Sequence, residues 1–326
     1  MNRKTLLACA ALAAVALAAP VGTAWAQAAY PSRPITLVIP FPPGGATDVV
    51  GRLVAKTLGD KLGQPVVADN RAGAGTTIGA TYVSKAAPDG YTLLISSGTT
   101  FTVNPAIQPK LAYDPVKSFE PLGMVARTGL ILLAHKDVPA NNPKEFVALA
   151  KASPDKYSYA SFGTGTTAQF TGELILRATD TKLLHVPYKG SAPAMTDLMG
   201  GQVPFSVDTV AAAIPQLKNG KIKAIAVTTA KRSALLPNVP TFAESGYDID
   251  ADTWVAVVAP RGLPPEVRAK LEKALADTVA NPEMREKLSA AGLEPRFMDG
   301  AALGSLIEKE LPVMRAIAQR ANILPE

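Results

Sequence analysis

The alternation of short β-type runs with amphipathic helical patterns is the feature that most restricts the fold of this chain. Candidate strands, rich in apolar and β-branched residues, lie at residues 35–41, 65–69, 91–97, 124–134, 157–162, 184–188, 203–208, 222–229 and 253–259. Helical patterns lie between most of them, at residues 47–62, 76–87, 143–152, 167–178 and 191–200. This order predicts an α/β fold with largely parallel sheets. From Pro264 onward the pattern predicts helices only, with a kink or a break at Pro312.

The length of the chain, 326 residues, exceeds what one hydrophobic core usually organises, so two domains are expected. A weak internal similarity supports two halves. The segments VIPFPPGGATDVVGRLVAKTL (38–58) and YSYASFGTGTTAQFTGELIL (157–176) both combine a strand, a glycine-rich turn, a threonine and an amphipathic helix. Two such turns, one in each half, are predicted to face each other across a cleft.

The N-terminus has the layout of a secretory signal peptide. A basic start precedes an apolar stretch at residues 6–19, and Ala24-Trp25-Ala26 predicts cleavage after this tripeptide. A membrane anchor is disfavoured because the apolar stretch is shorter than the ~20 residues that span a bilayer. Cys9, the only cysteine, lies too close to the basic start for a lipoprotein. We therefore expect residues 1–26 to be removed and the mature protein to be periplasmic.

Composition and charge argue against several classes of function. The formal net charge of +6 is a mild basic excess that favours anionic ligands, but no Lys/Arg run or aromatic-interleaved basic stripe indicates nucleic-acid binding. The two histidines, His135 and His185, are far apart and lack nearby Cys or carboxylate clusters. A zinc-type site and a His-based triad are therefore poorly supported, and we expect no metal, no cofactor and no catalytic residue.

Three glycine-rich loops are candidates for ligand binding, at residues 40–47, 70–80 and 161–169. In the first, Gly44 and Gly45 permit positive φ and a close approach to the backbone, and Thr47 or Asp48 is predicted to cap the following helix. Such a turn presents backbone N–H groups at the positive end of a helix, where anions bind. Hydroxyl groups beside N–H groups suit carboxylate oxygens, so we interpret the loops as anion sites. For any single loop, a tight turn without ligand is the alternative.

Nucleotide binding is disfavoured by the segment that follows the third loop. Gly163, Gly165 and Ala168 fit the form G-x-G-x-x-A, but that fingerprint also needs an acidic residue ~20 positions later. The corresponding segment LLHVPYKG (183–190) has none, and no G-x-x-x-x-G-K-[ST] motif occurs. Asp208 ends a predicted strand, where ligand sites of open α/β sheets gather; a turn or cap role is the alternative.

Five motifs resemble, in this order, those of the extracytoplasmic solute receptors of tripartite tricarboxylate transporters, the Bug family. They are YPSRPITLVIPFPPGGATDVVGR, NRAGAGTTIGATYVSKAAPDGYTLL, ASFGTGTTAQF, VPYKGSAPAMTDLMGGQV and ADTWVAVVAPRGLPPEV. The resemblance implies a two-lobed periplasmic binding protein (Venus flytrap) fold with two crossover segments. Residues 30–128 plus 253–326 would form lobe 1, and residues 129–252 would form lobe 2. It also implies a receptor without enzymatic activity that holds a carboxylate in the cleft through backbone groups and bridging waters.

The resemblance carries ligand-binding roles over to specific positions. In lobe 1 these are Phe41, Gly44, Gly45, Ala46, Thr47, Ser97 and Thr99; in lobe 2 they are Phe162, Gly163, Thr164, Gly165, Thr166, Thr167 and Asp208. The chain departs from the family pattern at Gln169, where His is frequent, and at Pro204, where an acidic residue is frequent. It also has Val255 and Ala256 where Gly often follows the aromatic residue. These departures alter the pocket around the rest of the ligand.

Together these features predict a periplasmic receptor that captures a small mono- or dicarboxylate, aliphatic or aromatic, by closing two lobes around it. We expect a monomer that delivers the ligand to membrane transporter subunits on separate chains. Two alternatives stay open, a ligand sensor for a signalling receptor and a secreted enzyme acting on a carboxylate. The enzyme would need a nucleophile with a base or a metal site, and the candidate loops are short of both.

Overall fold

The computed structural model describes residues 30–108, 110–154, 156–321 and 323. The chain from Arg33 onward forms one compact unit. The predicted signal peptide at residues 1–26 lies outside the described residues.

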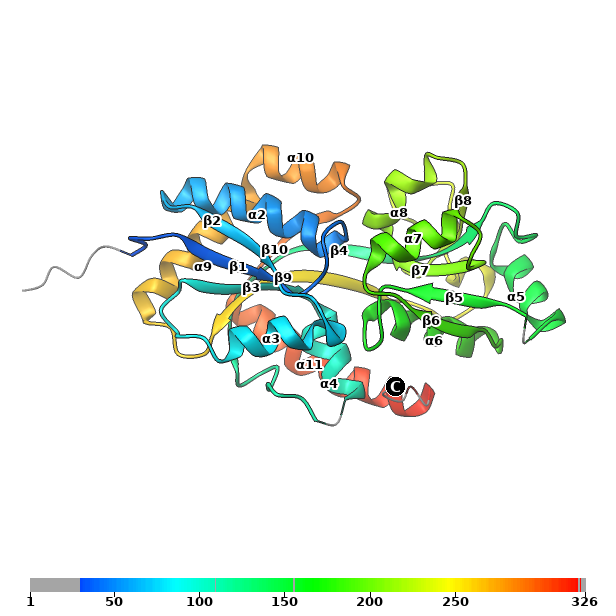
Figure 1. Cartoon of the computed structure of the whole chain (residues 1–326), viewed down its shortest axis with the longest axis horizontal. Helices are drawn as coiled ribbons and strands as arrows, with labels where there is room; N and C mark the ends of the chain where they lie inside the picture. The colour runs from blue at the N-terminus through cyan, green and yellow to red at the C-terminus, as the bar shows by residue number, and fades with distance from the viewer. Residues whose placement is uncertain (1–29, 109, 155, 322, 324–326) are drawn as a thin grey trace, which may run out of the picture. The chain divides into compact units, whose positions relative to one another are not determined.

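Strands and helices alternate along most of the unit, as predicted (Figure 1). The strands are β1 (Ile35–Ile39), β2 (Val66–Asn70), β3 (Thr92–Ser97), β4 (Phe119–His135), β5 (Ser158–Ser161), β6 (Leu184–Pro187), β7 (Phe205–Thr209), β8 (Ile222–Val227), β9 (Asp252–Pro260) and β10 (Glu294–Asp299). The α-helices are α2 (Ala46–Leu62), α3 (Thr77–Ser84), α4 (Asn104–Ile107), α5 (Pro143–Ala152), α6 (Thr167–Thr179), α7 (Ser191–Met199), α8 (Val210–Leu217), α9 (Pro265–Ala280), α10 (Pro282–Ala290) and α11 (Gly300–Ala321). Shorter helical segments are η1 (Ala74–Thr76), η2 (Thr99–Val103) and η3 (Ala243–Ser245).

The strands form a mixed sheet with the order β2-β1-β3-β9-β4-β7-β5-β6, and β8 and β10 pair with β4 outside this path. β1 is parallel to β2 and β3, and β5 is parallel to β6 and β7. β9 is antiparallel to β3 and β4, and β4 is antiparallel to β7, β8 and β10. The prediction of largely parallel sheets is therefore right for the strands at the two ends of the sheet. It is wrong for the centre of the sheet, because β4 and β9, the two longest strands, are antiparallel to their neighbours.

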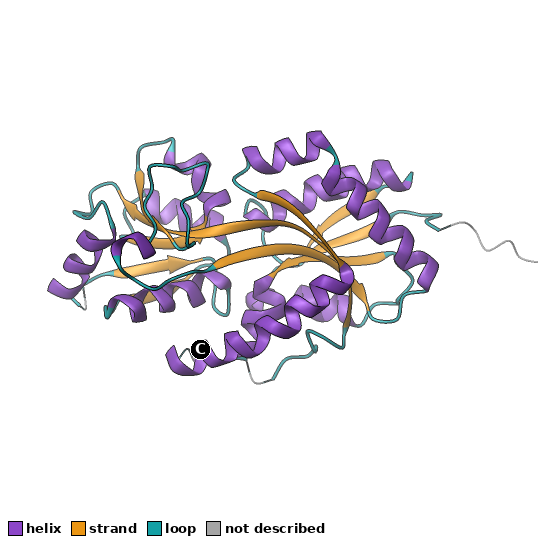
Figure 2. Cartoon of the chain, turned by 180° about the vertical axis from the view of Figure 1, so that it is seen from behind, coloured by secondary structure: helices purple, strands orange, loops and turns teal. Residues whose placement is uncertain are grey.

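β4 pairs with two different sets of strands. Its first part, Phe119–Gly129, pairs with β9, and its last part, Leu130–His135, pairs with β7 and β8. We call β1, β2, β3, β9, β10 and the first part of β4 the first strand group. β5 to β8 and the last part of β4 are the second strand group. The helices and loops that follow each strand are counted with its group. Figure 1 and Figure 2 show β4 and β9 running between the two groups.

Helices cover both faces of each strand group. In the first group, α2 and α10 lie on one face and α3 and α11 on the other; in the second, α7 and α8 lie on one face and α6 on the other (Figure 1). Sheets covered on both faces are built from nearly continuous apolar strands, and β1 (ITLVI) has four buried residues out of five. The strand ends and the loops that follow them are thereby held in fixed positions.

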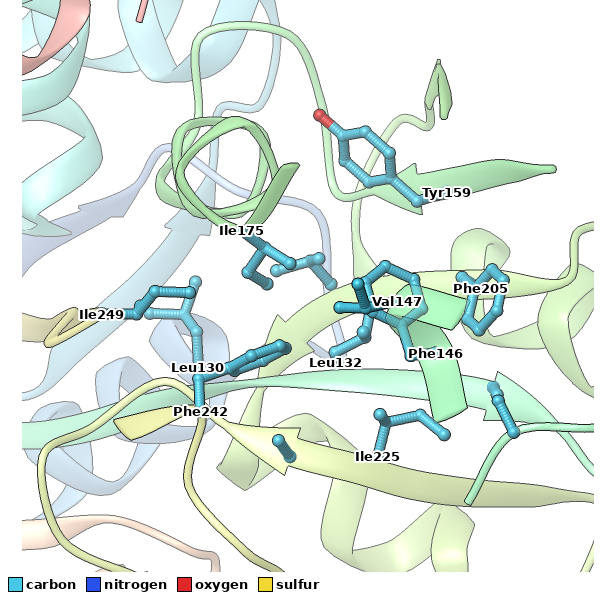
Figure 3. Close-up of a cluster of buried hydrophobic side chains, with 14 of the residues drawn as sticks. Leu130, Leu132, Phe146, Val147, Tyr159, Ile175, Phe205, Ile225, Phe242 and Ile249 are labelled. Atoms are coloured by element: carbon cyan, nitrogen blue, oxygen red, sulfur yellow. The ribbon is translucent and has the colours of Figure 1, made fainter. Parts of the chain in front are cut away.

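Each strand group has its own aromatic core. In the first, Phe101 stacks on Trp254 with ring centroids 5.7 Å apart, and the Trp254 Nε1–H donates to Glu310 at 3.0 Å. In the second, Phe146 meets Phe205 edge to face at 5.1 Å, within the cluster of buried side chains in Figure 3. Large fully buried side chains therefore fill the interior on both sides of the molecule.

The C-terminal part differs from the expectation of helices only, and a break at Pro312 does not occur. The region after Pro264 also contains β10, a mostly exposed strand that pairs with β4. α11 continues through Pro312 without a break. Proline has no N–H, so Pro312 cannot donate to the backbone carbonyl of Glu308. Both residues are exposed, so water can donate to that carbonyl and the helix tolerates the proline.

Candidate functional site

A small cavity of about 30 Å³ lies where loops of the two strand groups meet. We call it the inner cavity. It is lined by Phe41, Pro42, Gly45, Ala46, Thr47, Ser97, Thr128, Phe162, Thr167, Gly190, Ser191, Thr209, Thr253 and Val255. Seven of these residues carry hydroxyl groups, and none of the described lining residues is charged. The inner cavity therefore offers neutral hydrogen-bonding groups.

Two uncapped helix N-termini meet at the inner cavity. α2 begins after Gly45 and α7 begins after Gly190, so neither N-cap residue has a side chain that could accept from its helix. The two ends are close, because a Cβ added at Gly45 would stand 3.5 Å from Ser191 Oγ. The first N–H groups of a helix have no partner within it, and the helix dipole adds positive potential there. Two N-termini that face each other in this way favour an anion.

Gly190 allows this approach because it lacks a Cβ. Its φ is +116°, and an added Cβ would stand 2.9 Å from Pro42 Cγ. Pro42 follows β1 in the first strand group, whereas Gly190 precedes α7 in the second. A side chain at this position would push the two loops apart, so glycine is needed both for the backbone conformation and for the contact.

α6 and α8 also begin at the inner cavity, but some of their first N–H groups have partners in the chain. The Thr167 N–H donates to Thr99 Oγ1 at 3.1 Å, and the Ala212 N–H donates to Thr209 Oγ1 at 3.2 Å. Thr99 lies in η2 of the first strand group, so its bond to α6 joins the two groups. These helices contribute hydroxyl groups and their dipoles to the cavity.

The strands β3, β9 and β4 form a further side of the inner cavity. Ser97 is paired with Val255, and Thr128 is paired with Thr253. Directly paired residues of antiparallel strands project from the same face of the sheet. The Thr128 hydroxyl donates to the Gly292 carbonyl at 3.2 Å. Thr253 Oγ1 is buried and has no hydrogen-bond partner within the described part of the chain.

Phe41 and Phe162 separate the inner cavity from a larger outer one. Their rings meet edge to face with centroids 6.3 Å apart, and both residues line both cavities. The outer cavity, of about 740 Å³, extends along residues 72–76 and 187–190. The aromatic pair, with one ring from each strand group, is thus an apolar boundary between the two cavities.

Asp208 is fully buried directly behind the inner cavity. Its Oδ1 accepts from Ser191 Oγ at 3.0 Å and from the Thr209 N–H at 2.7 Å, and both of these residues line the cavity. Its Oδ2 has no partner in the described residues. Burial raises the pKa of Asp208 to about 7, although these hydrogen bonds act in the opposite direction. Asp208 therefore holds Ser191 and Thr209 in place.

Asp48 does not cap α2, contrary to the prediction. The N-cap is Gly45, and Asp48 lies in the first turn of the helix. Asp48 accepts hydrogen bonds from the Gly44 N–H at 3.1 Å, from Arg52 at 3.1 Å and from Asn70 at 2.8 Å. Burial opposes its ionisation, but these bonds outweigh burial and hold the pKa of Asp48 below its ordinary value. The ion pair with Arg52 reduces the repulsion that Asp48 would exert on an anion.

Half of the predicted binding residues line the inner cavity: Phe41, Gly45, Ala46, Thr47, Ser97, Phe162 and Thr167. The others do not line it: Gly44, Thr99, Gly163, Thr164, Gly165, Thr166 and Asp208. Of this second set, Gly163, Thr164 and Thr166 line the outer cavity.

A hydrogen-bond network engages two of the predicted backbone donors in the loop after β5. The Gly165 N–H donates to Gln169 Oε1 at 2.7 Å, so the amide nitrogen of Gln169 faces His185 Nδ1, 3.3 Å away. His185 Nε2 lies 2.7 Å from Ser161 Oγ, which also accepts from the Gly163 N–H. Because an amide nitrogen only donates, His185 Nδ1 is the acceptor in its contact with Gln169. The network fixes the shape of this loop.

Seven lining residues were not among the predicted binding residues: Pro42, Thr128, Gly190, Ser191, Thr209, Thr253 and Val255. Gly190 and Ser191 lie in VPYKGSAP, directly before a helical pattern, and a Gly-Ser pair in that position is a helix-start signal. Thr128 and Thr253 carry no local signal, because only the pairing of β4 with β9 brings them to the cavity.

The loop at residues 70–80, the second glycine-rich candidate, lies at the outer cavity. Four consecutive residues, 73–76, have positive φ, and two of them, Ala74 and Thr76, are not glycine. The Asn104 amide donates to the Gly75 carbonyl and, at 3.3 Å, to Thr76 Oγ1. This side chain holds the loop in a backbone conformation that is costly on its own.

The described residues contain neither a metal-binding cluster nor a membrane-spanning helix. No three His, Cys, Asp or Glu side chains gather there in a way that could hold a metal ion. None of the helices in the described ranges combines the length and the apolar character needed to cross a bilayer.

Residues 50–323 match the family model described as tripartite tricarboxylate transporter family receptor. Protein BugT of Bordetella pertussis is 37% identical over 299 residues, which cover 90% of this chain and 90% of BugT. The structure of the periplasmic binding protein BugD superposes with a TM-score of 0.86 at 37% identity, covering 91% of this chain and 100% of BugD. The match confirms the expected periplasmic binding protein fold.

Two similar structures contain ligands. MatC from Rhodopseudomonas palustris with bound malate has a TM-score of 0.84 at 33% identity, covering 88% of this chain and 99% of MatC. An R. palustris protein with adipate has a TM-score of 0.87 at 34% identity, covering 90% of this chain and 98% of that protein. BugD is described as a periplasmic binding protein. The chain belongs to the tripartite tricarboxylate transporter receptor family, the Bug family of periplasmic solute-binding receptors.

Proposed function

We propose that this protein captures a small carboxylate at the inner cavity, in the periplasm, and delivers it to the membrane subunits of a tripartite tricarboxylate transporter. The observation that carries the proposal is the meeting of two uncapped helix N-termini, those of α2 and α7, at a cavity lined by hydroxyl groups. Each carboxylate oxygen accepts several hydrogen bonds, and N–H and O–H donors at a helix N-terminus supply them.

The composition of the site favours a carboxylate over a more highly charged anion. Phosphate and sulfate sites commonly use Arg or Lys, and the described residues that line the inner cavity include neither. Malate in MatC and adipate in the second R. palustris protein support the same ligand class. Binding requires no chemical step, and we propose that the protein acts as a receptor and not as an enzyme.

We infer that the two strand groups are two lobes, residues 30–128 plus 253–326 and residues 129–252. β4 changes its partner from β9 to β7 between Gly129 and Leu130, and β9 begins at Asp252, which supports these boundaries. Each lobe then supplies one uncapped helix N-terminus. A carboxylate that contacts both binds the closed arrangement better than an open one, so ligand shifts the population toward closure.

Ligand titration with succinate, malate and adipate, with glucose and succinamide as neutral controls, tests the proposal. A carboxylate at 100 times its Kd should stabilise the monomeric receptor by ~2.7 kcal/mol and raise its Tm. Its radius of gyration in solution should fall as the lobes close. Stabilisation and compaction by glucose, with all three carboxylates inert, would overturn the carboxylate assignment. Uptake assays with the membrane subunits, with and without this receptor, test delivery separately.

A further inference from the structure

The hydroxyl of Thr253 differs from the other hydroxyls at the inner cavity. Thr253 is 3% exposed, and it alone among the described lining residues has a buried side-chain oxygen without a hydrogen-bond partner. Its strand neighbour Thr128, by contrast, donates to the Gly292 carbonyl. Buried polar side chains are nearly always paired, so an unpaired one at a binding cavity indicates a group that a ligand satisfies.

The position of Thr253 complements the helix N-termini. It lies on β9, two residues before Val255 and therefore on the same face of the sheet, which is the face that lines the inner cavity. A Cβ added at Gly98 would stand 3.5 Å from Thr253 Oγ1, which places this hydroxyl at the end of β3. The N–H groups at the starts of α2 and α7 belong to helices, whereas the Thr253 hydroxyl belongs to the sheet, so the donors reach the cavity from different elements.

We propose that Thr253 donates its hydroxyl hydrogen to one oxygen of the buried carboxylate, while N–H groups at the starts of α2 and α7 bind the other. This inference rests on the proposed function and deepens it by naming a ligand-binding residue outside the glycine-rich loops. Thr253 contacts the carboxylate head group, so its contribution is the same for every carboxylate, whatever the rest of the molecule contains.

The test measures the binding of butyrate, succinate and malate to wild type, Thr253→Val and Thr253→Ser by calorimetry. Valine has nearly the shape of threonine but lacks the hydroxyl, so we expect all three probes to lose affinity by about tenfold or more. Serine keeps the hydroxyl and should restore most of the affinity. Removing an unpaired buried hydroxyl should leave the Tm of the free protein unchanged or raise it. Thr81→Val is the matched control, since Thr81 Oγ1 is also unpaired but lies outside the inner cavity.

Each of the following binding results would contradict one step of this proposal. Unchanged affinity of Thr253→Val for all probes would show that the hydroxyl bonds to resident water and does not contact the ligand. A loss confined to malate would show that Thr253 binds the rest of the ligand instead of the head group. An equal loss in Thr253→Ser would assign the effect to packing. Wild-type protein that binds none of the three probes would overturn the proposed function itself.

Discussion

The backbone of Gly75 lies against the carbonyl oxygen of Thr164, so closely that a Cβ added at Gly75 would stand 2.5 Å from that oxygen. Gly75 belongs to η1 in the first strand group, and Thr164 belongs to the loop after β5 in the second. A Cβ added at Gly165 would in turn stand 2.6 Å from Asn104 Oδ1. The two glycines thus allow the loops of the two groups to meet beside the outer cavity, although neither lines the inner one.

Substitution of Gly75 by alanine should weaken carboxylate binding without touching the inner cavity. The added methyl group collides with the Thr164 carbonyl and forces the two loops apart, so we expect the affinity for succinate to fall by about tenfold, or ~1.4 kcal/mol. The positive φ of +57° adds about 1 kcal/mol of strain to the folded state. Calorimetric titration and thermal unfolding measure the two effects.

Gly63→Ala is the matched control for this substitution. Gly63 has a φ of +70° and nothing within 4 Å of an added Cβ, so the variant shares the backbone strain without the collision. It should lose stability and keep its affinity for succinate. Equal affinity in Gly75→Ala and Gly63→Ala would show that the contact with Thr164 does not contribute to binding.

The raised pKa of Asp208, about 7, makes stability depend on pH in a defined direction. The folded protein retains a proton that the unfolded chain releases near the ordinary pKa of 3.8, so this stabilisation is complete below that pH. It is lost progressively as the pH rises to about 7. Asp208→Asn should flatten this part of the curve of the free energy of unfolding against pH, because asparagine keeps an acceptor for Ser191 and Thr209 but has no charge to bury. A curve identical to that of wild type would contradict the assignment.

The same carboxyl group should make ligand binding depend on pH. Above pH 7 the ionised Asp208 lies behind a cavity proposed for an anion, and their repulsion opposes binding. We expect the affinity for butyrate, which stays ionised throughout, to rise as the pH falls from 8 to 6. Asp208→Asn should remove this trend and bind more tightly than wild type at pH 8. A trend that persists in the variant would place the titrating group elsewhere.

The parts of the site that could be predicted are those with local signals. β1, the turn that contains Gly45, and α2 follow one another in sequence, and the change from strand to helix periodicity identifies the loop between them. Phe41 and Thr47, two of the predicted binding residues, lie beside this loop and line the inner cavity. Thr253 could not be found in this way, since it lies inside an apolar strand and reaches the cavity only because β9 pairs with both β3 and β4.

The predictions about the fold that were incomplete or wrong also failed where long-range pairing, and not a local pattern, decides the structure. β10, with the sequence EPRFMD, is mostly exposed and lacks the apolar alternation of a half-buried strand, so only its pairing with β4 makes it a strand. α8, VAAAIPQL, is short and contains Pro215, and it is not among the predicted helical segments. The antiparallel centre of the sheet depends on long-range strand order, and local patterns do not contain that information.

Replacement of Gln169 by leucine should destabilise the protein through the loop after β5. The variant leaves the Gly165 N–H without its acceptor and removes a partner of His185, so we expect a loss of about 1–3 kcal/mol in the free energy of unfolding. Urea unfolding measures it, and Gln202→Leu, at an exposed position, is the control. The expected loss of shape in this loop should also weaken succinate binding. A variant as stable as wild type would show that water replaces the side chain at no cost.

Trp254 and Thr253 should have opposite roles, since consecutive residues of β9 point to opposite faces of the sheet. Trp254 is buried in the first core, where it stacks on Phe101 and donates to Glu310. Trp254→Phe removes that donor and part of the packing, so we expect a loss of about 2 kcal/mol in the free energy of unfolding, with succinate affinity within about twofold of wild type. Thr253→Val should show the reverse pattern, with affinity lost and stability kept. Chemical denaturation and calorimetry on both variants compare the two roles directly. An equal loss of affinity in Trp254→Phe and Thr253→Val would show that the two faces of β9 do not act independently. Distortion of the strand, and not the missing hydroxyl, would then explain the weaker binding.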